Sequence, residues 1–212
     1  MTQDEHVWHR EVVDAGVERT LAALERIPSL ADFYLAGGTG LALHLGHRRS
    51  LDLDLFSAED FDVEAVLQDI QRLDGFALVS KSPGTIYSTI QSTKVSLIAY
   101  AYPMLFPLHR FLGAQVADPR DIGCMKISAI ASRGTKRDFI DLYFLAQTHG
   151  LDQLLGWFAK KYAKTNYSTI HVLKSLTYFE EAERDPMPDM LAPLSWDAVK
   201  QFFTREASRL VE

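Results

Sequence analysis

The sequence predicts an α+β fold in which a mixed αβ half is followed by a helical half. Short apolar runs that end at turns, or that alternate with polar residues, occur before about residue 110 and are typical of strands. Beyond that point, apolar residues recur at helical spacing. We therefore expect an αβ core over residues 1–112 and one continuous helical lobe over residues 113–212.

Helices and short strands alternate in the αβ core. The helical period of residues 7–26 ends at Ile27-Pro28-Ser29. Thr39 can cap a short helix that runs to about Gly46. Strands are expected at residues 33–36, 51–55, 76–80, 85–91 and 94–100, and a further helix at residues 60–73.

The helical lobe begins at a strong helix start. Asp118-Pro119-Arg120-Asp121 combines an N-cap, a proline at the first helical position and an acid in the first turn. This helix is expected to end near Ser132, before the break at Arg133-Gly134-Thr135. Just upstream, the apolar run from Tyr100 to Phe111 fits either a buried loop or a partner surface. The later helices are expected at residues 136–148, 151–184 and 195–211, with a rigid break at residues 185–188.

Composition describes a globular chain in a reducing compartment. Of the 212 residues, 47% are hydrophobic and 24% are charged, which excludes disordered and fibrous classes. The single cysteine, Cys124, excludes an internal disulfide framework. The polar first residues differ from a secretory signal, and no apolar stretch reaches the ~18 residues of a membrane span. We expect a cytoplasmic protein with no membrane partner.

The net charge of −6, from 22 basic and 28 acidic residues, does not point to nucleic acid. One local run, Lys160-Lys161-Tyr162-Ala163-Lys164, leaves RNA binding open, because Tyr162 and Tyr167 can stack on bases. The alternative for this run is a solvated helix face.

Two aspartates in a predicted strand are the first candidates for chemistry. Asp52 and Asp54 are expected to point to one face with Cα atoms roughly 6.5–7 Å apart, while Leu51, Leu53 and Leu55 point into the core. Carboxylates so placed can bind one or two divalent cations, and without a cation their repulsion costs stability. A solvated strand face is the alternative.

A glycine-rich turn precedes these aspartates. Gly37-Gly38-Thr39 lies where a strand is expected to turn into a helix, so backbone N–H groups and the helix dipole favour a phosphate there. The segment matches neither a P-loop nor a dinucleotide fingerprint, and a plain tight turn is the alternative. Since the carboxylates follow 13 and 15 residues after Thr39, the combination indicates a nucleoside triphosphate with Mg²⁺.

Basic residues and histidines lie between these two elements. Arg49 can contact phosphate oxygens, whereas Arg48 is expected to be solvated. His44 and His47 are spaced so that they can share a metal on a helix, but no further ligands accompany them. Zinc is therefore a minor alternative.

Two helical segments add charged candidates. Lys126 lies among apolar neighbours, where it either extends to water or contacts a phosphate. Asp138 and Asp141 share a helix face beside Lys136 and Arg137. The alternative for this second group is a salt-bridged helix start.

Together, these segments resemble the AbiEii/AbiGii toxin family of nucleotidyltransferases, within the DNA polymerase β-like superfamily. The resemblance implies a minimal nucleotidyltransferase mixed sheet with flanking helices, followed by a helical C-terminal lobe. It spans roughly residues 30–145, and the tail from Tyr178 to Trp196 is similar to a subgroup of the family. The four matching segments are residues 35–39, residues 49–56, Lys126 and residues 133–143.

The resemblance also implies an activity: transfer of a nucleoside monophosphate from an NTP, with pyrophosphate leaving. Related toxins modify RNA, in some cases tRNA acceptor ends, and are encoded beside an antitoxin that is often a transcriptional regulator. By position, the resemblance assigns Gly37, Gly38, Thr39, Arg49, Ser50, Lys136 and Arg137 to nucleotide binding, Asp52 and Asp54 to Mg²⁺ and catalysis, and Lys126 and Asp138 to catalysis.

One position departs from the superfamily pattern. A third carboxylate is expected on a later strand, and Ser96 stands there instead. Serine cannot replace a metal-binding carboxylate or act as a general base at neutral pH. Either Asp138 or another acid compensates, or the chain binds nucleotide without efficient transfer.

Three hypotheses follow from the sequence. The leading one is a Mg²⁺-dependent nucleotidyltransferase toxin that acts on an RNA, tRNA included, or on a protein. The second is a nucleotide-binding, catalytically weakened module that acts through a partner protein. The third is nucleotide transfer to a small molecule such as an antibiotic.

Overall fold

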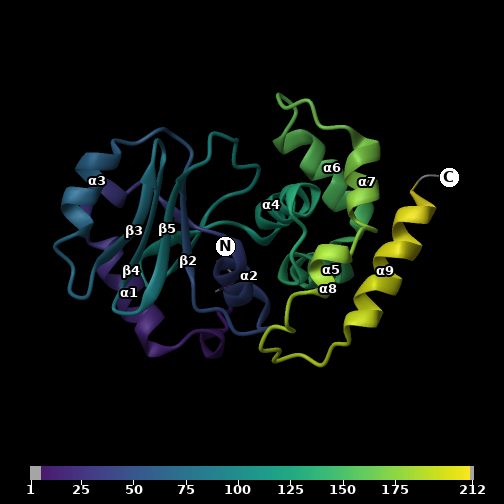
Figure 1. Ribbon diagram of the computed structural model, residues 1–212, viewed down its shortest axis with the longest axis horizontal. Helices are drawn as coiled ribbons and strands as arrows, with labels where there is room; N and C mark the ends of the chain where they lie inside the picture. The colour runs from purple at the N-terminus through teal and green to yellow at the C-terminus, as the bar shows by residue number, and fades with distance from the viewer. Residues whose placement is uncertain (1–5, 211–212) are drawn as a thin grey trace, which may run out of the picture. The chain divides into compact units, whose positions relative to one another are not determined.

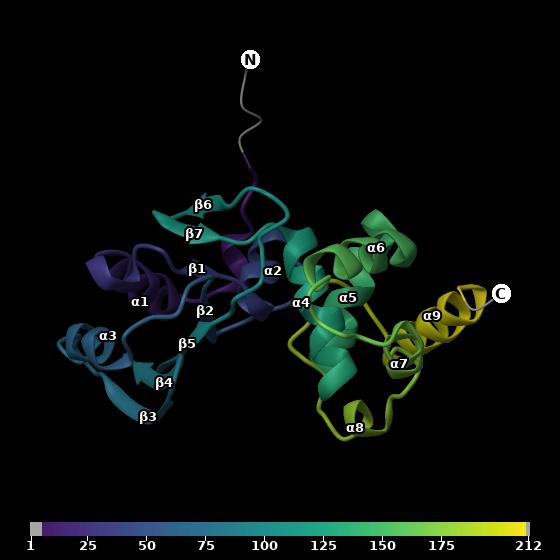
Figure 2. The same ribbon diagram turned by 90° about the horizontal axis from the view of Figure 1, so that it is seen from above.

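The computed structural model describes residues 6–210, and these form two compact units (Figures 1 and 2). The sheet unit comprises the chain up to Pro103 together with Pro107–Asp118. The helical unit takes Met104–Phe106 together with the chain from Pro119. No helix in the described part of the chain is long and apolar enough to cross a membrane.

A seven-stranded mixed sheet forms the sheet unit, in the order β3-β4-β5-β2-β1-β7-β6. Strand β2 lies parallel to β5 and antiparallel to β1, and β1 lies parallel to β7. The strands are β1 (Tyr34–Leu35), β2 (Leu53–Ser57), β3 (Ala77–Ser82), β4 (Thr85–Ile90), β5 (Thr93–Ala99), β6 (His109–Phe111) and β7 (Ala114–Val116).

Helices cover this sheet from both sides. Figure 1 shows α1 (Ala15–Glu25) and α3 (Val63–Ile70) on one side of the sheet and α2 (Gly37–Leu45) on the other. Both α1 and α3 begin at an aspartate whose carboxylate accepts hydrogen bonds from backbone N–H groups of the first turn. Buried apolar side chains of α1, α3 and strand β2 share one core, which fixes β2 in the middle of the sheet.

The helical unit is built around α4 (Pro119–Ser132), which packs against α5 (Lys136–His149), α6 (Leu151–Lys161) and α7 (Thr169–Ser175). Two further helices, α8 (Glu180–Glu183) and α9 (Trp196–Arg209), pack against α5. Phe139 on α5 lies fully buried, with its ring centroid 5.6 Å from that of Phe203 on α9. This aromatic contact joins the C-terminal helix to the rest of the unit.

The predicted α+β class is confirmed, and several local predictions are wrong. The expected helix over residues 7–26 is only the eleven-residue α1 preceded by a 3₁₀ turn, and Val7 is 75% exposed. Leu51 is 50% exposed because β2 begins at Leu53, so it does not join the core. The expected helix over residues 151–184 is divided into α6, α7 and α8, because Tyr162 leaves the helical conformation and Ser168 caps a new helix.

The structure also contains a hairpin that the sequence analysis did not predict. Strands β6 and β7 pair antiparallel around Leu112 and Gly113, which both have positive φ, at 49° and 92°. Two residues with positive φ form the tight hairpin turn that matches strand twist. The end of the apolar run from Tyr100 to Phe111 is therefore a strand, and β6 forms one edge of the sheet.

Candidate active site

The turn from β1 into α2 carries the carboxylate of Asp54. Gly37 has a φ of +61°, which residues with a side chain rarely adopt. A Cβ atom at Gly37 would lie 2.7 Å from Oδ2 of Asp54, and the backbone N–H of Ala36 donates to the Asp54 carbonyl at 3.0 Å. Only glycine fits here, because the carboxylate occupies the space of a side chain.

The next glycine faces an arginine. A Cβ at Gly38 would collide with the guanidinium of Arg48, which is only 2% exposed and donates to the carbonyl of Arg49 at 3.0 Å. The expectation that Arg48 is solvated is therefore wrong. Arg49 is the exposed member of the pair, because the irregular path of the loop after α2 turns the first arginine inward. A positive charge thus lies directly at the glycine turn.

Thr39 and Ser50 connect the helix to the strand. The Thr39 side chain is 1% exposed, and its Oγ1 lies 2.8 Å from Oγ of Ser50. The same hydroxyl hydrogen-bonds to the backbone carbonyl of Asp52. Its role in this structure is to hold the start of β2 against the first turn of α2.

Ser96 is the direct neighbour of Asp54 across the sheet. In the parallel β2–β5 pair, Asp54 lies opposite Ser96, so both side chains lie on the same face, and both residues are partly exposed. The hydroxyl therefore stands beside the carboxylate, where a third metal-binding acid was expected from the sequence.

Asp54 lies in β2, and Asp52 directly precedes this strand, so the two carboxylates belong to residues two positions apart in the chain. Among residues 6–210, no group of three or more His, Cys, Asp or Glu side chains is arranged to hold a metal ion. Mg²⁺ is commonly bound by one or two carboxylates together with substrate phosphates rather than by an all-protein cage. The zinc alternative for His44 and His47 finds no support, since the His44 ring hydrogen-bonds to His6 and to the carbonyl of Ala117.

The charged candidates of the helical unit form a buried ion-pair group. Nζ of Lys126 lies 2.9 Å from Oδ1 of Asp138 and 2.7 Å from Oδ2 of Asp141. The three side chains are at most 9% exposed, so the expectation that Lys126 extends to water is wrong. Burial alone would raise the pKa of Asp138, but the Lys126 charge and hydrogen bonds from Thr135 and Lys126 outweigh burial and lower it.

Lys136 and Arg137 differ in their surroundings. Lys136 is buried: its backbone N–H donates to Oδ2 of Asp185 at 3.0 Å, and its ammonium hydrogen-bonds to the Asp185 carbonyl. The same ammonium lies 5.3 Å from the centre of the Trp196 ring. Arg137, one residue later, is exposed. The Lys136 side chain therefore holds the segment after α8 against the start of α5.

The basic run at the end of α6 is divided: Lys160 and Lys164 are exposed, whereas Lys161 and Tyr162 are buried. Nζ of Lys161 lies 2.7 Å from Oδ1 of Asp121, and both side chains are fully buried. Asp121 also accepts the backbone N–H groups of Leu105 and Phe106. Tyr162 is only 2% exposed. Both interpretations of this run are therefore wrong for Lys161, because its partner lies forty residues earlier in the chain.

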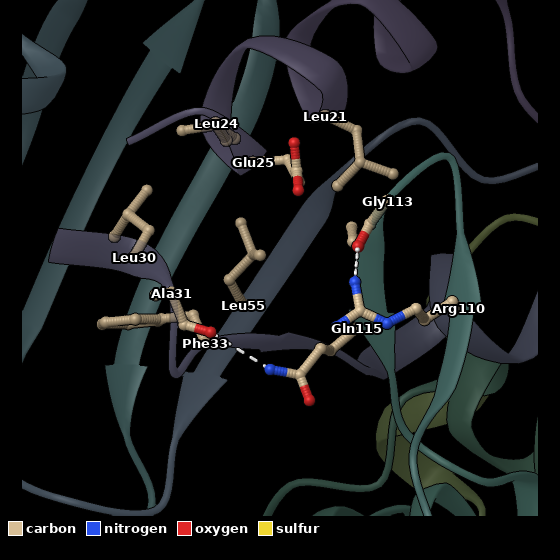
Figure 3. A pocket seen from close by; sticks show the side chains of 11 residues that line it. Leu21, Leu24, Glu25, Leu30, Ala31, Phe33, Leu55, Arg110, Gly113 and Gln115 are labelled. Carbon is tan, nitrogen blue, oxygen red and sulfur yellow. Dashed lines mark hydrogen bonds between the residues drawn. The ribbon is translucent and has the colours of Figure 1, made fainter. Parts of the chain in front are cut away.

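A hollow in the sheet unit lies away from the aspartates. It has a volume of about 200 Å³ and is lined by α1, the residues before β1, and the β6–β7 hairpin (Figure 3). Leu55 of β2 lines this hollow, whereas its neighbour Asp54 belongs to the opposite face of the strand. At its rim, Arg110 donates to the carbonyl of Gly113, and Gln115 donates to the carbonyl of Ala31. The hollow is therefore separate from the two aspartates of the candidate active site.

Comparison with known proteins gives consistent matches along nearly the whole chain. The sequence model described as "Nucleotidyl transferase AbiEii toxin, Type IV TA system" matches residues 19–209. The uncharacterized protein aq_aa25 of Aquifex aeolicus is 39% identical over 199 residues, which cover 90% of this chain and 95% of that protein. The nucleotidyltransferase toxin MenT4 of Mycobacterium tuberculosis has a similar fold, with a TM-score of 0.56, 16% identity, and coverage of 92% of this chain and 86% of that chain. JHP933 of Helicobacter pylori aligns over 92% of this chain and 95% of its own, with 15% identity and a TM-score of 0.44.

Proposed function

Since the chain belongs to the AbiEii family of nucleotidyltransferase toxins, we propose that it transfers a nucleoside monophosphate from a Mg²⁺-bound NTP to an RNA acceptor. The observation that carries this proposal is the Asp54 carboxylate held against the Gly37 turn at the start of α2. This arrangement joins a metal-binding group to an anion-binding helix start. Within the type IV toxin–antitoxin description of the family, we further propose an antitoxin partner of the transcriptional-regulator type.

We assign the triphosphate to the first turn of α2. The N-terminal N–H groups of a helix have no partners within the helix, and the helix dipole favours negative charge there. The glycines let the Asp54 carboxylate lie beside Gly37 and the Arg48 guanidinium beside Gly38, so a metal-binding group and a cation both lie at this helix start. The exposed Arg49 and Arg137, together with Ser50, are proposed as further nucleotide contacts. Thr39 acts in this scheme by holding Asp52 in place.

Asp52 and Asp54 are the residues that would hold Mg²⁺. When bound, the metal would neutralise charge on the phosphates during transfer of the nucleotidyl group. The protein's own contribution is to fix the two carboxylates: the buried Leu53 and Leu55 anchor β2, and the glycine turn orients Asp54. The buried ammonium of Lys126 is shared by the carboxylates of Asp138 and Asp141, so we propose that this group acts by positioning α4 and α5 within the helical unit.

The test is incubation of the purified protein with each α-³²P-labelled NTP, Mg²⁺ and total RNA. The matched control is the double variant Asp52→Ala, Asp54→Ala. Label in RNA with the intact protein alone would support the proposal and identify the nucleotide. Unchanged labelling in the double variant would remove both aspartates from the site.

A second candidate function is favoured by Ser96. Because a serine stands beside Asp54, the chain is alternatively a nucleotide-binding module that acts through a partner protein. Binding of Mg²⁺-NTP without label in any RNA would favour this function, whereas label on a protein would indicate a protein acceptor. Resistance to an antibiotic on expression, rather than growth arrest, would indicate a small-molecule acceptor.

A further inference from the structure

One segment of the helical unit has no acidic residue. The chain as a whole carries 28 Asp and Glu residues among 212, but residues 153–179 contain none. Four lysines lie in this segment, which runs from α6 through α7. A local excess of positive charge in an acidic chain is the electrostatic signature of a surface that meets a polyanion.

The same segment lines a hollow of about 250 Å³. Its walls include the rings of Phe158, Tyr162 and Tyr167, with centroids 4.7 Å apart for Phe158–Tyr162 and 5.1 Å apart for Phe158–Tyr167. Phe158 and Tyr162 are buried and support Tyr167, which is the partly exposed ring of the three. The Tyr167 hydroxyl lies 2.9 Å from Oγ of Ser128, which fixes that ring against α4. The hollow is smaller than a typical drug-sized site, so it fits one planar group of a larger ligand.

Exposed lysines flank this aromatic hollow. Lys160 follows the lining residue Ala159, and Lys164 lies between the lining residues Ala163 and Thr165. Both lysines are exposed, whereas Lys161, which lies between them in the sequence, is buried and forms an ion pair with Asp121. Aromatic rings with flanking ammonium groups match the two parts of a nucleotide unit in a single strand, the base and its phosphates.

We propose that the hollow between α6 and α7 binds an unpaired base of single-stranded RNA, while Lys160 and Lys164 contact the adjacent phosphates. The threonine hydroxyls of the lining, Thr165 and Thr169, supply polar groups for a base edge. A duplex cannot use the site in this way, because its bases are stacked and paired. The site deepens the proposed function by giving the RNA acceptor a docking surface on the helical unit, and its binding is measurable without NTP.

The experiment measures fluorescence anisotropy of a labelled 12-nucleotide single strand, and of its duplex, with the full chain at several salt concentrations. Lys160→Glu with Lys164→Glu tests the charges, and Arg72→Glu with Lys94→Glu makes the same charge change on exposed residues of the sheet unit. Ala159→Leu with Ala163→Leu fills the hollow, and Gln153→Leu puts the same side chain elsewhere on α6. Circular dichroism confirms that each variant is folded.

We expect the lysine variant to lose about tenfold or more in affinity and to show a shallower salt dependence. The filled variant should lose about tenfold with the salt dependence unchanged, because stacking and not charge is removed. Both control variants should bind within about twofold of the parent chain. The Asp52→Ala, Asp54→Ala protein should bind the labelled single strand as tightly as the parent chain does. Loss of RNA binding at the hollow and loss of nucleotidyl transfer are therefore measured separately.

Four results would overturn the assignment. The first is a lysine variant that binds no worse than the Arg72→Glu, Lys94→Glu control. The second is a duplex that binds as tightly as the single strand, and the third is a filled variant of full affinity. The fourth is an acidic peptide with an aromatic residue that binds more tightly than the RNA and whose binding is lost in the same variants, which would assign the hollow to a protein partner.

Discussion

The candidate charged side chains of the sheet unit and of the helical unit differ in their burial and in their ion pairing. In the sheet unit, Asp54 is partly exposed, and its carboxylate lies against the glycine turn at the start of α2. In the helical unit, Lys126, Asp138 and Asp141 are buried, and the one ammonium contacts both carboxylates. Charges that are paired inside the protein hold its helices together, whereas partly exposed charges at the N-terminus of a helix are available to a substrate. The comparison predicts that substitutions in the first region change activity and those in the second change stability.

The largest expected effect is on activity in the sheet unit. Asp54→Asn keeps the shape of the side chain but removes the charge that would hold Mg²⁺. We expect NTP-dependent labelling to fall on the order of 10³-fold, about 4 kcal/mol in activation free energy. The free energy of unfolding should stay the same or rise slightly, because the repulsion between Asp52 and Asp54 is relieved. Labelling time courses and urea unfolding of the same preparation measure both, and a large loss of stability would contradict this division of roles.

The matched change in the helical unit should affect stability instead. Asp141→Asn removes the carboxylate that lies 2.7 Å from Nζ of Lys126, while Asp138 stays in contact with the same ammonium. The neutral amide cannot replace the charge-assisted contact of the carboxylate, and we expect a loss of about 2 kcal/mol in the free energy of unfolding. Urea unfolding checks the value, with the exposed Asp152→Asn on α6 as the control. A variant of parental stability that has lost all labelling would instead make Asp141 part of the reaction.

The sequence located the glycine turn and the two aspartates because the features that define them are local. The Gly37-Gly38 pair and the alternation of leucine and aspartate over residues 51–55 are visible within a few residues, although β2 itself begins only at Leu53. The roles of Arg48 and Lys161 were not visible. Arg48 faces inward because of the path of an irregular loop, and Lys161 is buried because Asp121 lies opposite it in the folded unit. Neither the loop path nor a partner forty residues away has a signature in a short window of sequence.

The two units also differ in the pH at which they lose stability. Burial, with the neighbouring His6 and His109, lowers the pKa of His44 in the sheet unit to about 3, and the Ala117 carbonyl and Asp118 only partly oppose this. Because the folded pKa lies below the unfolded value, stability is complete above about pH 6.5 and falls as the pH drops toward 3. Asp138 in the helical unit also has a lowered pKa, but a carboxylate loses its contribution only below about pH 4.

Mild acid should therefore weaken the sheet unit first. Between pH 7 and pH 5, we expect His44 to remove about 2 kcal/mol from the free energy of unfolding. His44→Gln keeps a donor for the Ala117 carbonyl but does not titrate. Between pH 7 and pH 5, the variant should therefore lose about 2 kcal/mol less of its free energy of unfolding than the parent chain loses. Urea unfolding followed by Trp8 fluorescence, with Trp157 and Trp196 replaced by Phe, reports on the sheet unit because the Trp8 ring lies 4.6 Å from that of His44. An equal fall in both proteins would show that His44 is not the group responsible, and His171→Gln on α7 is the control.

The smallest expected effect concerns the serine beside Asp54, and it decides how the open site works. If Asp52 and Asp54 suffice for Mg²⁺, then Ser96→Ala removes a hydroxyl that cannot serve as a metal-binding carboxylate, and labelling should stay within about threefold of the parent. The side chain is partly exposed, so the loss of its hydroxyl should cost little stability. The labelling assay with the preferred NTP measures the change, with Ser88→Ala in the neighbouring strand β4 as a comparison for a buried serine. A loss of tenfold or more at Ser96 alone would make its hydroxyl a contact of the substrate, because no effect on the fold would then account for it.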